Sequence, residues 1–244
     1  MLHTTKAIVL RTIKYGDTSI VVTMYTELFG VQSYLVNGVR SEKKSSAKAN
    51  IYQPTTLLDL EVYHQPNKNL QRIKEARIYF LYQSLQSVMV KNTIAIFVTE
   101  LITKTISEPE ESAVLFDFFE NCYMHIEKSA TSSLANFPIL FTLQLADRLG
   151  FALQNHYTES TPVLDLQNGL FCTMADIQHG YYCLESNAKL LSEIFLSDEN
   201  QIINANLNQQ KRKELLAICL QYIHLHIPHM GELKSVEILH EILS

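Results

Sequence analysis

Cysteine, glycine and long apolar runs are all scarce in this chain of 244 residues. Its cysteines form no C-x-x-C pair, which argues against a disulfide scaffold and against a four-cysteine zinc site; they are Cys122, Cys172, Cys183 and Cys219. Seven glycines leave little material for a phosphate-binding loop. No run approaches the ~18–20 apolar residues that a membrane span needs, so we expect no membrane segment.

Motifs of the common enzyme classes are absent as well. The sequence contains no P-loop, no dinucleotide-binding glycine motif, no nucleophile elbow and no H-E-x-x-H metal motif. Nothing nominates a nucleophile or an acid–base pair, so we predict a protein that is not an enzyme and uses no cofactor. The first residues pass directly into a strand pattern without the apolar stretch of a signal peptide, and we therefore expect a cytoplasmic location.

The charge that is present is unevenly distributed. Residues 1–80 hold 11 Lys and Arg against 6 Asp and Glu, a net charge of +5. Residues 81–244 hold 9 against 19, a net charge of −10, and the whole chain therefore carries −5. A positive segment joined to a negative body suggests that a polyanion binds at one end of the molecule only.

Residues 1–80 show the period-2 pattern of β-structure. Strand patterns with turn residues between them cover 6–13, 18–27, 32–36, 58–62 and 70–80. Five strands and one long basic loop, residues 39–50, suit a small closed barrel of the OB type. An open five-stranded sheet is the alternative, because alternation does not reveal closure.

From residue 81 the period changes to that of helices. Apolar residues recur at i, i+3, i+4 and i+7 in two runs, residues 94–102 and 115–126. Further helices are predicted over 134–149, 187–196, 208–227 and 232–243. Between them, residues 151–186 break into short irregular pieces. We therefore predict an α+β protein with two domains, an OB-type barrel over 1–80 and an all-helical domain over 81–244.

The densest basic cluster falls within the predicted loop and consists of Arg40, Lys43, Lys44 and Lys48. Cations of this kind bind nucleic acid because each neutralised phosphate releases counterions, which requires no sequence readout. A solvated loop is the alternative. Further cations of the barrel widen the patch if they face the same side: Lys6, Arg11, Lys14, Arg72, Lys74 and Arg77.

Two sets of aromatic residues invite functional hypotheses. Tyrosines of the barrel offer stacking surfaces for unpaired bases, although we expect at least half of them to be core residues; they are Tyr15, Tyr25, Tyr34 and Tyr52. Near the C-terminus a metal hypothesis arises from His224, His226, His229 and Glu232. Residues two apart point to nearly opposite sides of a helix, so we expect structural or surface histidines there and no metal site.

Several longer stretches carry a family resemblance. In KAIVLRTIKYGDTSIVVTMYTELFG an opening strand, a Y-G-D turn and a second strand ending in T-x-x-x-G precede the basic VNGVRSEKKS. The pattern continues through QPTTLLDLEV and NLQRIKEARI, then into the helix with Lys91 and Glu100, and returns in HIPHMGELKSVEIL. In these stretches, and in their order, the chain resembles the RecO family of bacterial DNA repair and recombination mediators over nearly its full length.

The resemblance implies an OB-fold domain followed by a helical domain, in agreement with the periodicity. It also implies a non-catalytic role: binding single- and double-stranded DNA, annealing complementary strands, and helping RecA load onto DNA covered by single-strand-binding protein. The implied partners are RecR, the acidic C-terminal tail of single-strand-binding protein and, indirectly, RecA. The implied location is the nucleoid. By position, Arg40, Lys43, Lys44 and Lys48 inherit the DNA-contact role.

One departure from the family concerns zinc. Many relatives carry a four-cysteine zinc module in the region that corresponds to about 155–185, where this chain holds only Cys172 and Cys183. We therefore predict a variant without the module and without zinc. Ordinary packing, by Phe171, Tyr181 and Tyr182, is expected to stabilise the segment instead.

Two other functions remain open beside a DNA-annealing mediator. The first is a helical interaction scaffold with negligible DNA binding, whose barrel binds protein. The second is a metal hydrolase that uses His224, His226 and Glu232. The mediator is the leading hypothesis, because a protein that neutralises phosphates lowers the repulsion between two strands without any covalent chemistry.

Overall fold

A computed structural model describes residues 1–39, 50–106, 111–196, 205–227 and 229–243. The chain forms two compact units, Met1–Lys128 and Ser129–Ser244, which are considered separately below. None of the described helices has both the length and the apolar character that crossing a membrane requires. The predicted domain boundary after residue 80 is the point at which strands give way to helices. The first unit also includes the two helices that follow the boundary.

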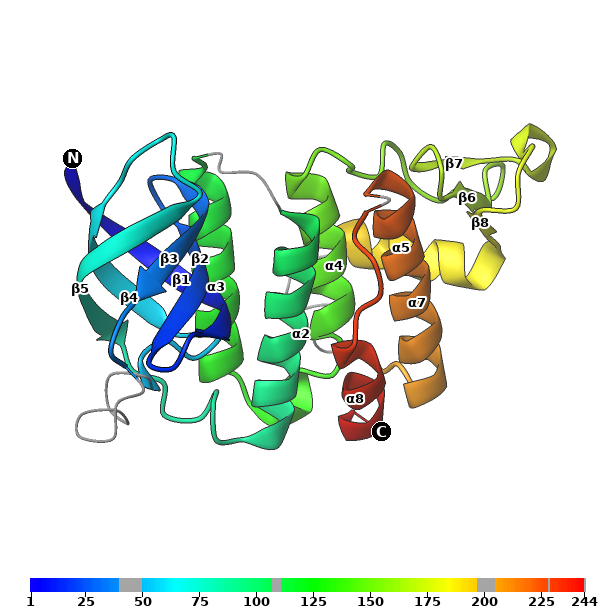
Figure 1. Cartoon of the computed structure of the whole chain (residues 1–244). Coiled ribbons are helices and arrows are strands. Elements are labelled where there is room, and N and C mark those ends of the chain that lie inside the picture. Colours follow the sequence, from blue (N-terminus) through cyan, green and yellow to red (C-terminus); the bar gives the residue numbers. More distant parts are fainter. Residues whose placement is uncertain (40–49, 107–110, 197–204, 228, 244) are drawn as a thin grey trace. The chain divides into compact units, whose positions relative to one another are not determined.

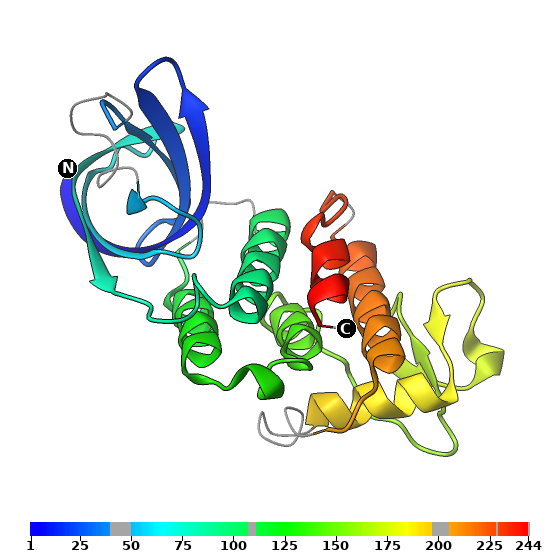
Figure 2. The same ribbon diagram turned by 90° about the horizontal axis from the view of Figure 1, so that it is seen from below.

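The first unit contains a closed five-stranded barrel, as predicted from the period-2 segments. Its strands are β1 (Leu2–Tyr15), β2 (Ser19–Thr26), β3 (Gly30–Val36), β4 (Leu57–Tyr63) and β5 (Leu70–Phe80). They close in the order β1-β2-β3-β5-β4, and the ring is seen in Figure 2. Only β3 and β5 pair in parallel, over three residues; the other pairs are antiparallel. Closure excludes the open sheet.

Inward-pointing residues fill the barrel. Alternate residues of each strand form one core cluster that includes Val22, Met24 and Leu60, each at most 1% exposed. Between β1 and β2, Gly16 has φ +58, which a glycine adopts at little cost and which allows the tight reversal of the chain. An extra residue at Leu10 shifts the pairing of β1 with β2, a β-bulge that separates two halves of the long first strand.

Two helices complete the first unit, α2 (Met89–Thr105) and α3 (Ala113–Lys128) (Figure 1). The stripe predicted for α2 is confirmed, because each of its members is fully buried: Ile94, Phe97, Val98, Leu101 and Ile102. The stripe predicted for α3 is buried as well, except for the half-buried Leu115. Phe116 of α3 lies outside the predicted stripe, yet it is fully buried, because it packs against the barrel.

The carboxylate of Glu127 joins the end of α3 to the segment that leads from β5 into α2. It accepts hydrogen bonds from the main-chain N–H groups of Gln83, Ser84 and Leu85, the last at 2.7 Å. The buried Lys91 donates to the Ser84 hydroxyl at 2.9 Å and to the main-chain oxygen of Glu127. These contacts satisfy N–H groups that precede α2 and fasten α3 to it.

The second unit is built mainly of helices: α4 (Phe137–Arg148), α5 (Glu185–Leu196), α7 (Gln209–His226) and α8 (Ser235–Ile242). Two short 3-10 turns also belong to it, η1 (Thr131–Ser133) and η2 (Met174–Asp176). Asn208 caps α7, because its side chain accepts a hydrogen bond from the main-chain N–H of Lys211. The four helices lie where the periodicity predicted them.

A small sheet lies in the segment predicted to be irregular. Its strands are β6 (Val163–Asp165), β7 (Leu170–Cys172) and β8 (Tyr182–Cys183), in the order β7-β6-β8. Strands of two or three residues are too short to show an alternation. The buried Asp165 fixes the β6–β7 turn, where its carboxylate accepts from the N–H groups of Gln167 and Asn168. The predicted fold class, an OB-type barrel followed by a helical region, is confirmed, with this sheet added.

Candidate nucleic-acid interface

The barrel has an outward face whose two ends differ. On β2, Ile20, Val22 and Met24 belong to the core cluster, so the residues between them point outward. Helix α3 covers one end of that face. The ring of Tyr25 lies edge-on to Phe119, with centroids 5.1 Å apart, and is 1% exposed. This covered end belongs to the core of the unit.

The other end of the outward face is open to solvent. Side chains of directly paired strand residues lie on the same side of a sheet. Arg11 on β1 pairs with Thr23 on β2, and Thr23 pairs with Ser33 on β3, so these three point the same way. Continuing the pairing around the barrel gives the outward-pointing residues of this end, which define the open face: Leu2, Arg11, Ile13, Tyr15, Ser19, Val21, Thr23, Ser33, Leu35, Tyr63, Leu70 and Arg72.

The open face combines apolar and aromatic surface with positive charge. Ile13 is 43% exposed, Tyr15 55% and Tyr63 48%. Two of the twelve residues are arginines and none is acidic. Guanidinium groups bind phosphates with paired hydrogen bonds, and exposed aromatic rings stack on unpaired bases. A face that offers both kinds of contact suits a nucleic-acid strand whose bases are exposed.

A groove of about 540 Å³ adjoins the open face, between the end of β3 and β5. Leu35 and Arg72 belong to both. Val39 and Ile51 also line the groove, and these are residues at the two ends of the predicted basic loop. The cations of that loop lie outside the described residues, so their role stays a prediction: Arg40, Lys43, Lys44 and Lys48.

The described cations of the predicted patch do not all share one face. Three are held by carboxylates: Lys6 by Glu120 at 3.5 Å, Lys74 by Glu61 at 2.7 Å and Arg77 by Glu75 at 2.6 Å. Arg11, Lys14 and Arg72 have no ion pair within the described residues. Lys14 pairs with the inward-pointing Ile20 and therefore points away from the open face. Arg11 and Arg72 thus both belong to the open face, on different strands, and Lys74 lines the adjoining groove together with Glu75.

Of the four tyrosines considered for base stacking, three are buried and one is exposed, in line with the expectation that at least half are core residues. Tyr25, Tyr34 and Tyr52 are at most 6% exposed, and burial raises the pKa of Tyr52 to about 12. Only Tyr15 is available for stacking. Sequence reasoning missed Tyr63, although it follows the alternation of β4 and points outward for the same reason as Tyr15.

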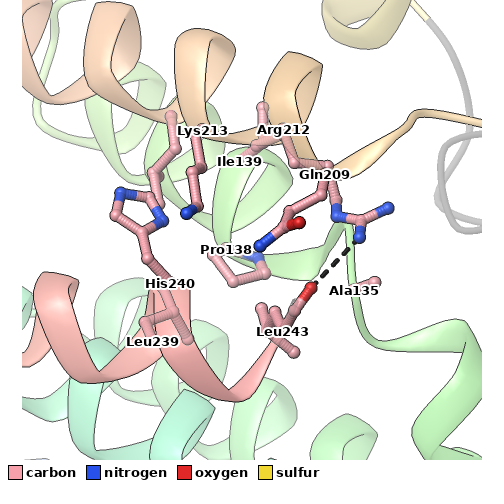
Figure 3. A pocket seen from close by; sticks show the side chains of 10 residues that line it. Ala135, Pro138, Ile139, Gln209, Arg212, Lys213, Leu239, His240 and Leu243 are labelled. Carbon is pink, nitrogen blue, oxygen red and sulfur yellow. Dashed lines mark hydrogen bonds between the residues drawn. The ribbon is translucent and has the colours of Figure 1, made fainter.

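A second candidate site is a pocket in the second unit, lined by residues of α7 and α8 and by the start of α4 (Figure 3). Its apolar lining comes mainly from Pro138, Ile139, Leu216, Leu239 and Leu243. Its polar lining consists of Gln209, Arg212, Lys213 and His240. Its volume is about 20 Å³, little more than a water molecule occupies, so a ligand with apolar and negatively charged groups would lie over its apolar residues and cations rather than inside it.

The cations of this pocket are not equally available. Arg212 donates hydrogen bonds to the main-chain oxygens of Leu207 and Leu243, the latter at 3.1 Å (Figure 3). Lys213 has no hydrogen bond or ion pair within the described part of the chain. Burial and the nearby Lys213 ammonium lower the pKa of His240. Among the described residues, none of those that line the pocket is a carboxylate that would balance this positive charge.

The C-terminal histidines are structural or exposed, as expected. His226 is the last residue of α7; its Nδ1 lies 2.9 Å from the main-chain oxygen of Tyr222 and its ring contacts Phe151. His224 and His229 are exposed. Across the described ranges, no three His, Cys, Asp or Glu residues come together in a way that could hold a metal ion.

The cysteines of the predicted zinc-free segment lie in the small sheet. Cys172 on β7 and Cys183 on β8 are both buried on strands that pair with β6, and burial raises the pKa of Cys183 to about 12. Phe171 is 2% exposed, so its predicted packing role is confirmed. The same prediction is wrong for Tyr181, which is 44% exposed because it precedes β8 at the edge of the sheet.

Comparison with known proteins covers nearly the whole chain. Residues 1–82 match the model of the recombination protein O N-terminal domain and residues 86–237 that of the C-terminal domain. The chain belongs to the RecO family. It is 32% identical over 243 residues to the DNA repair protein RecO of Christiangramia forsetii, with 99% of each chain covered. The RecO proteins of Bacteroides fragilis and Flavobacterium psychrophilum are also 32% identical, over 242 and 241 residues, with 99% and 98% of each chain covered.

Membership of the RecO family places the chain among DNA repair proteins. The two family matches meet between residues 82 and 86, in the segment that links β5 to α2. The open face therefore lies within the N-terminal match and the cationic pocket is lined by residues 135–243, most of them within the C-terminal match. Both candidate sites therefore lie largely within regions that match the family.

Proposed function

We propose that this RecO family member is a non-catalytic mediator of DNA repair and recombination. In this proposal it binds single- and double-stranded DNA, anneals complementary strands and acts with RecR to help RecA load onto DNA covered by single-strand-binding protein. The observation that carries the proposal is the open face, whose outward-pointing residues include Arg11, Arg72 and exposed apolar and aromatic side chains but no carboxylate. DNA binding would also associate the protein with the nucleoid.

The proposed mechanism requires no covalent chemistry. Arg11 and Arg72 neutralise phosphates of one strand, and Tyr15, Ile13 and Tyr63 contact its unpaired bases. Two free strands repel each other along their full length, so neutralising phosphates on one of them favours the approach of its complement. The groove beside Arg72 leads toward the ends of the basic loop. We assign to the loop cations, Arg40, Lys43, Lys44 and Lys48, the additional phosphate contacts that a duplex needs.

The other cations predicted to contact DNA are expected to contribute less to binding than Arg11 and Arg72. Lys14 is exposed and extends the positive surface beyond the open face, whereas Lys6 and Lys74 must first leave their carboxylate partners. A phosphate and a carboxylate compete for the same ammonium group, so these two contribute less than the arginines.

For the second unit we propose that the cationic pocket binds the acidic C-terminal tail of single-strand-binding protein. In this proposal Lys213 and His240 face the carboxylates of the tail, and its apolar groups lie against the surface formed by Leu216, Leu239 and Leu243. RecR and, through it, RecA are proposed partners on the basis of family membership alone.

The deciding experiment measures DNA binding by variants of the open face. We expect Arg11→Ala combined with Arg72→Ala to weaken single-strand binding and to reduce the slope of log K against log salt by about 1.4, or about 0.7 for each lost phosphate contact. The matched control is Arg77→Ala, since Arg77 is an exposed arginine of the same barrel outside the open face and is held by Glu75. We expect the control to bind as the unaltered chain does.

A loop variant separates the two parts of the interface. With Arg40, Lys43, Lys44 and Lys48 all changed to Ala, we expect a larger loss for duplex DNA than for single strands. An unchanged salt slope in both the arginine double variant and the loop variant would refute the assignment of this surface. Negligible DNA binding by the unaltered chain, together with salt-resistant binding of RecR, would favour the interaction scaffold instead.

A further inference from the structure

His240 occupies an unusual electrostatic position in the cationic pocket. Its imidazole lines the pocket from α8, and Figure 3 shows the ring beside the side chain of Lys213, which comes from α7. Both side chains border the same apolar lining. An ordinary surface histidine is free to turn toward water, but a neighbouring cation opposes its protonation.

Among the described residues, the charges around His240 come from two of the three elements that line the pocket. Helix α7 contributes Lys213 and Arg212, and α8 itself carries Glu237 and Glu241. The residues of the α4 region that line the pocket, Ala135, Pro138 and Ile139, bear no charge. Among the described ion pairs, none joins His240 or Lys213 to a carboxylate.

The N-terminal end of α7 adds to this positive field. Lys211, Arg212 and Lys213 follow each other in its first turns, and no acidic residue lies in the first turn. Main-chain N–H groups give a helix a partial positive charge at this end, so three consecutive cations there are unfavourable unless an anion approaches. Lys211 is already balanced by Glu214 at 3.2 Å, which leaves Lys213 and His240 to meet a ligand.

We propose that His240 takes up a proton when the pocket binds an acidic peptide, so that binding of the tail becomes tighter as the pH falls through the neutral range. The inference rests on the tail pocket proposed above and adds a regulating residue to it. His240 is assigned a recognition role because, in this arrangement, its imidazolium contacts the ligand's carboxylate directly.

The physical reason is that ligand binding changes the electrostatic environment of the His240 imidazole from one that disfavours protonation to one that favours it. In the free protein, burial and Lys213 favour the neutral imidazole, in line with its lowered pKa. A ligand carboxylate offsets the Lys213 ammonium and accepts a hydrogen bond from the imidazolium, and both effects favour the charged form. By linkage, a ligand that raises the pKa of a group binds more tightly to its protonated form.

The test is a titration of the full chain with a labelled synthetic peptide, the acidic C-terminal tail of single-strand-binding protein. Anisotropy is measured at constant ionic strength. We expect affinity to rise about three- to tenfold between about pH 8 and about pH 6, since one unit of pKa difference corresponds to a tenfold change. Peptide carboxylates stay ionised throughout this range, so a titrating imidazole accounts for the change.

Three variants separate His240 from the other groups. His240→Gln is expected to abolish the pH dependence and to weaken peptide binding, with the larger loss near pH 6, where the imidazolium of the unaltered chain contacts the ligand. Lys213→Gln is expected to weaken binding at every pH and to reduce the pH dependence, because the free imidazole then protonates more readily. The matched control, His224→Gln, removes an exposed histidine of α7 and should keep the full pH dependence.

A direct measurement on the unaltered chain avoids any effect of substitution on folding. The imidazole resonances are followed by NMR against pH with and without saturating peptide, and saturation is expected to raise the pKa of His240. Peptide that binds without raising it, or a His240→Gln chain that keeps the pH dependence, overturns the proton uptake but leaves the tail pocket in place. Peptide that does not bind at any pH overturns both.

Discussion

The covered and the open ends of the barrel's outward face are made by the same strands and differ in what lies over them. At the covered end Tyr25 is buried against Phe116 and Phe119 of α3. At the open end Tyr15 and Ile13 have similar chemistry but remain about half exposed. The comparison shows that side chains of one kind stabilise the fold where a helix covers them and become available to a ligand where none does.

The bulge at Leu10 marks the change from one end to the other. On its N-terminal side Ile8 pairs with Tyr25 and is fully buried; on its C-terminal side Arg11 pairs with Thr23 and is exposed. A bulge bends and twists its strand. The β1–β2 hairpin therefore continues past the region that α3 covers, and its outward residues meet solvent.

The largest expected effect tests the covered end. Phe119→Ala removes a fully buried ring that contacts Tyr25, and we expect it to lower the free energy of unfolding by about 3–5 kcal/mol. Ile13→Ala at the open end should change that free energy by about 0.5 kcal/mol or less, as exposed substitutions do. Urea unfolding followed by circular dichroism measures both. Comparable losses in the two variants would contradict the division of the face into two ends.

The next prediction tests the hydrogen bonds by which Glu127 joins the end of α3 to the segment before α2. Glu127→Gln replaces a carboxylate that accepts several N–H groups ahead of α2, and we expect a loss of about 1–2 kcal/mol near pH 7. Burial opposes ionisation of Glu127, but donation from Leu85, Gln83 and Ser84 outweighs it and lowers the pKa from its ordinary 4.5.

The sign of the pH dependence follows from that lower pKa. Protonation favours the unfolded chain, so the contribution of Glu127 is complete above pH 4.5 and declines as the pH falls through the folded-state pKa. The stability difference between the unaltered chain and Glu127→Gln should therefore shrink in acid. Urea unfolding at several pH values measures it, with Glu75→Gln, an exposed carboxylate of β5, as the control. A difference that stays constant down to about pH 3 would contradict the assigned role.

Much of the fold could be predicted because it depends on local periodicity. Alternation located five strands, and the i, i+3, i+4 stripe of α2 identified residues that are fully buried. The strands β6–β8 escaped prediction because two or three residues show no period. Phe116 escaped because its burial comes from the barrel rather than from the stripe of its own helix.

The candidate site was predictable only as a set of residue types. Positive charge alone made Arg11, Arg72, Lys6 and Lys74 equal candidates for DNA contact. The sequence does not show that Lys6 forms an ion pair with Glu120 and Lys74 one with Glu61. Alternation predicts that Tyr25 and Tyr15 both point out of the barrel. It does not predict that α3 packs over Tyr25 and leaves Tyr15 exposed, because that depends on tertiary packing. The cationic pocket joins residues from 135 to 243 and had no sequence signature.

The smallest expected effect tests what the open end does with its exposed aromatic ring. Tyr15→Ala should weaken single-strand binding about fivefold, the lower part of the range for base stacking, because Tyr15 is only 55% exposed. Duplex binding should change by less than about twofold, since paired bases already stack on one another. Tyr15→Phe keeps the ring and should restore single-strand affinity, which excludes a role for the hydroxyl group. Anisotropy titrations with matched single- and double-stranded oligonucleotides measure both. An equal loss for the two DNA forms would show that Tyr15 acts through the shape of the hairpin rather than through stacking on unpaired bases.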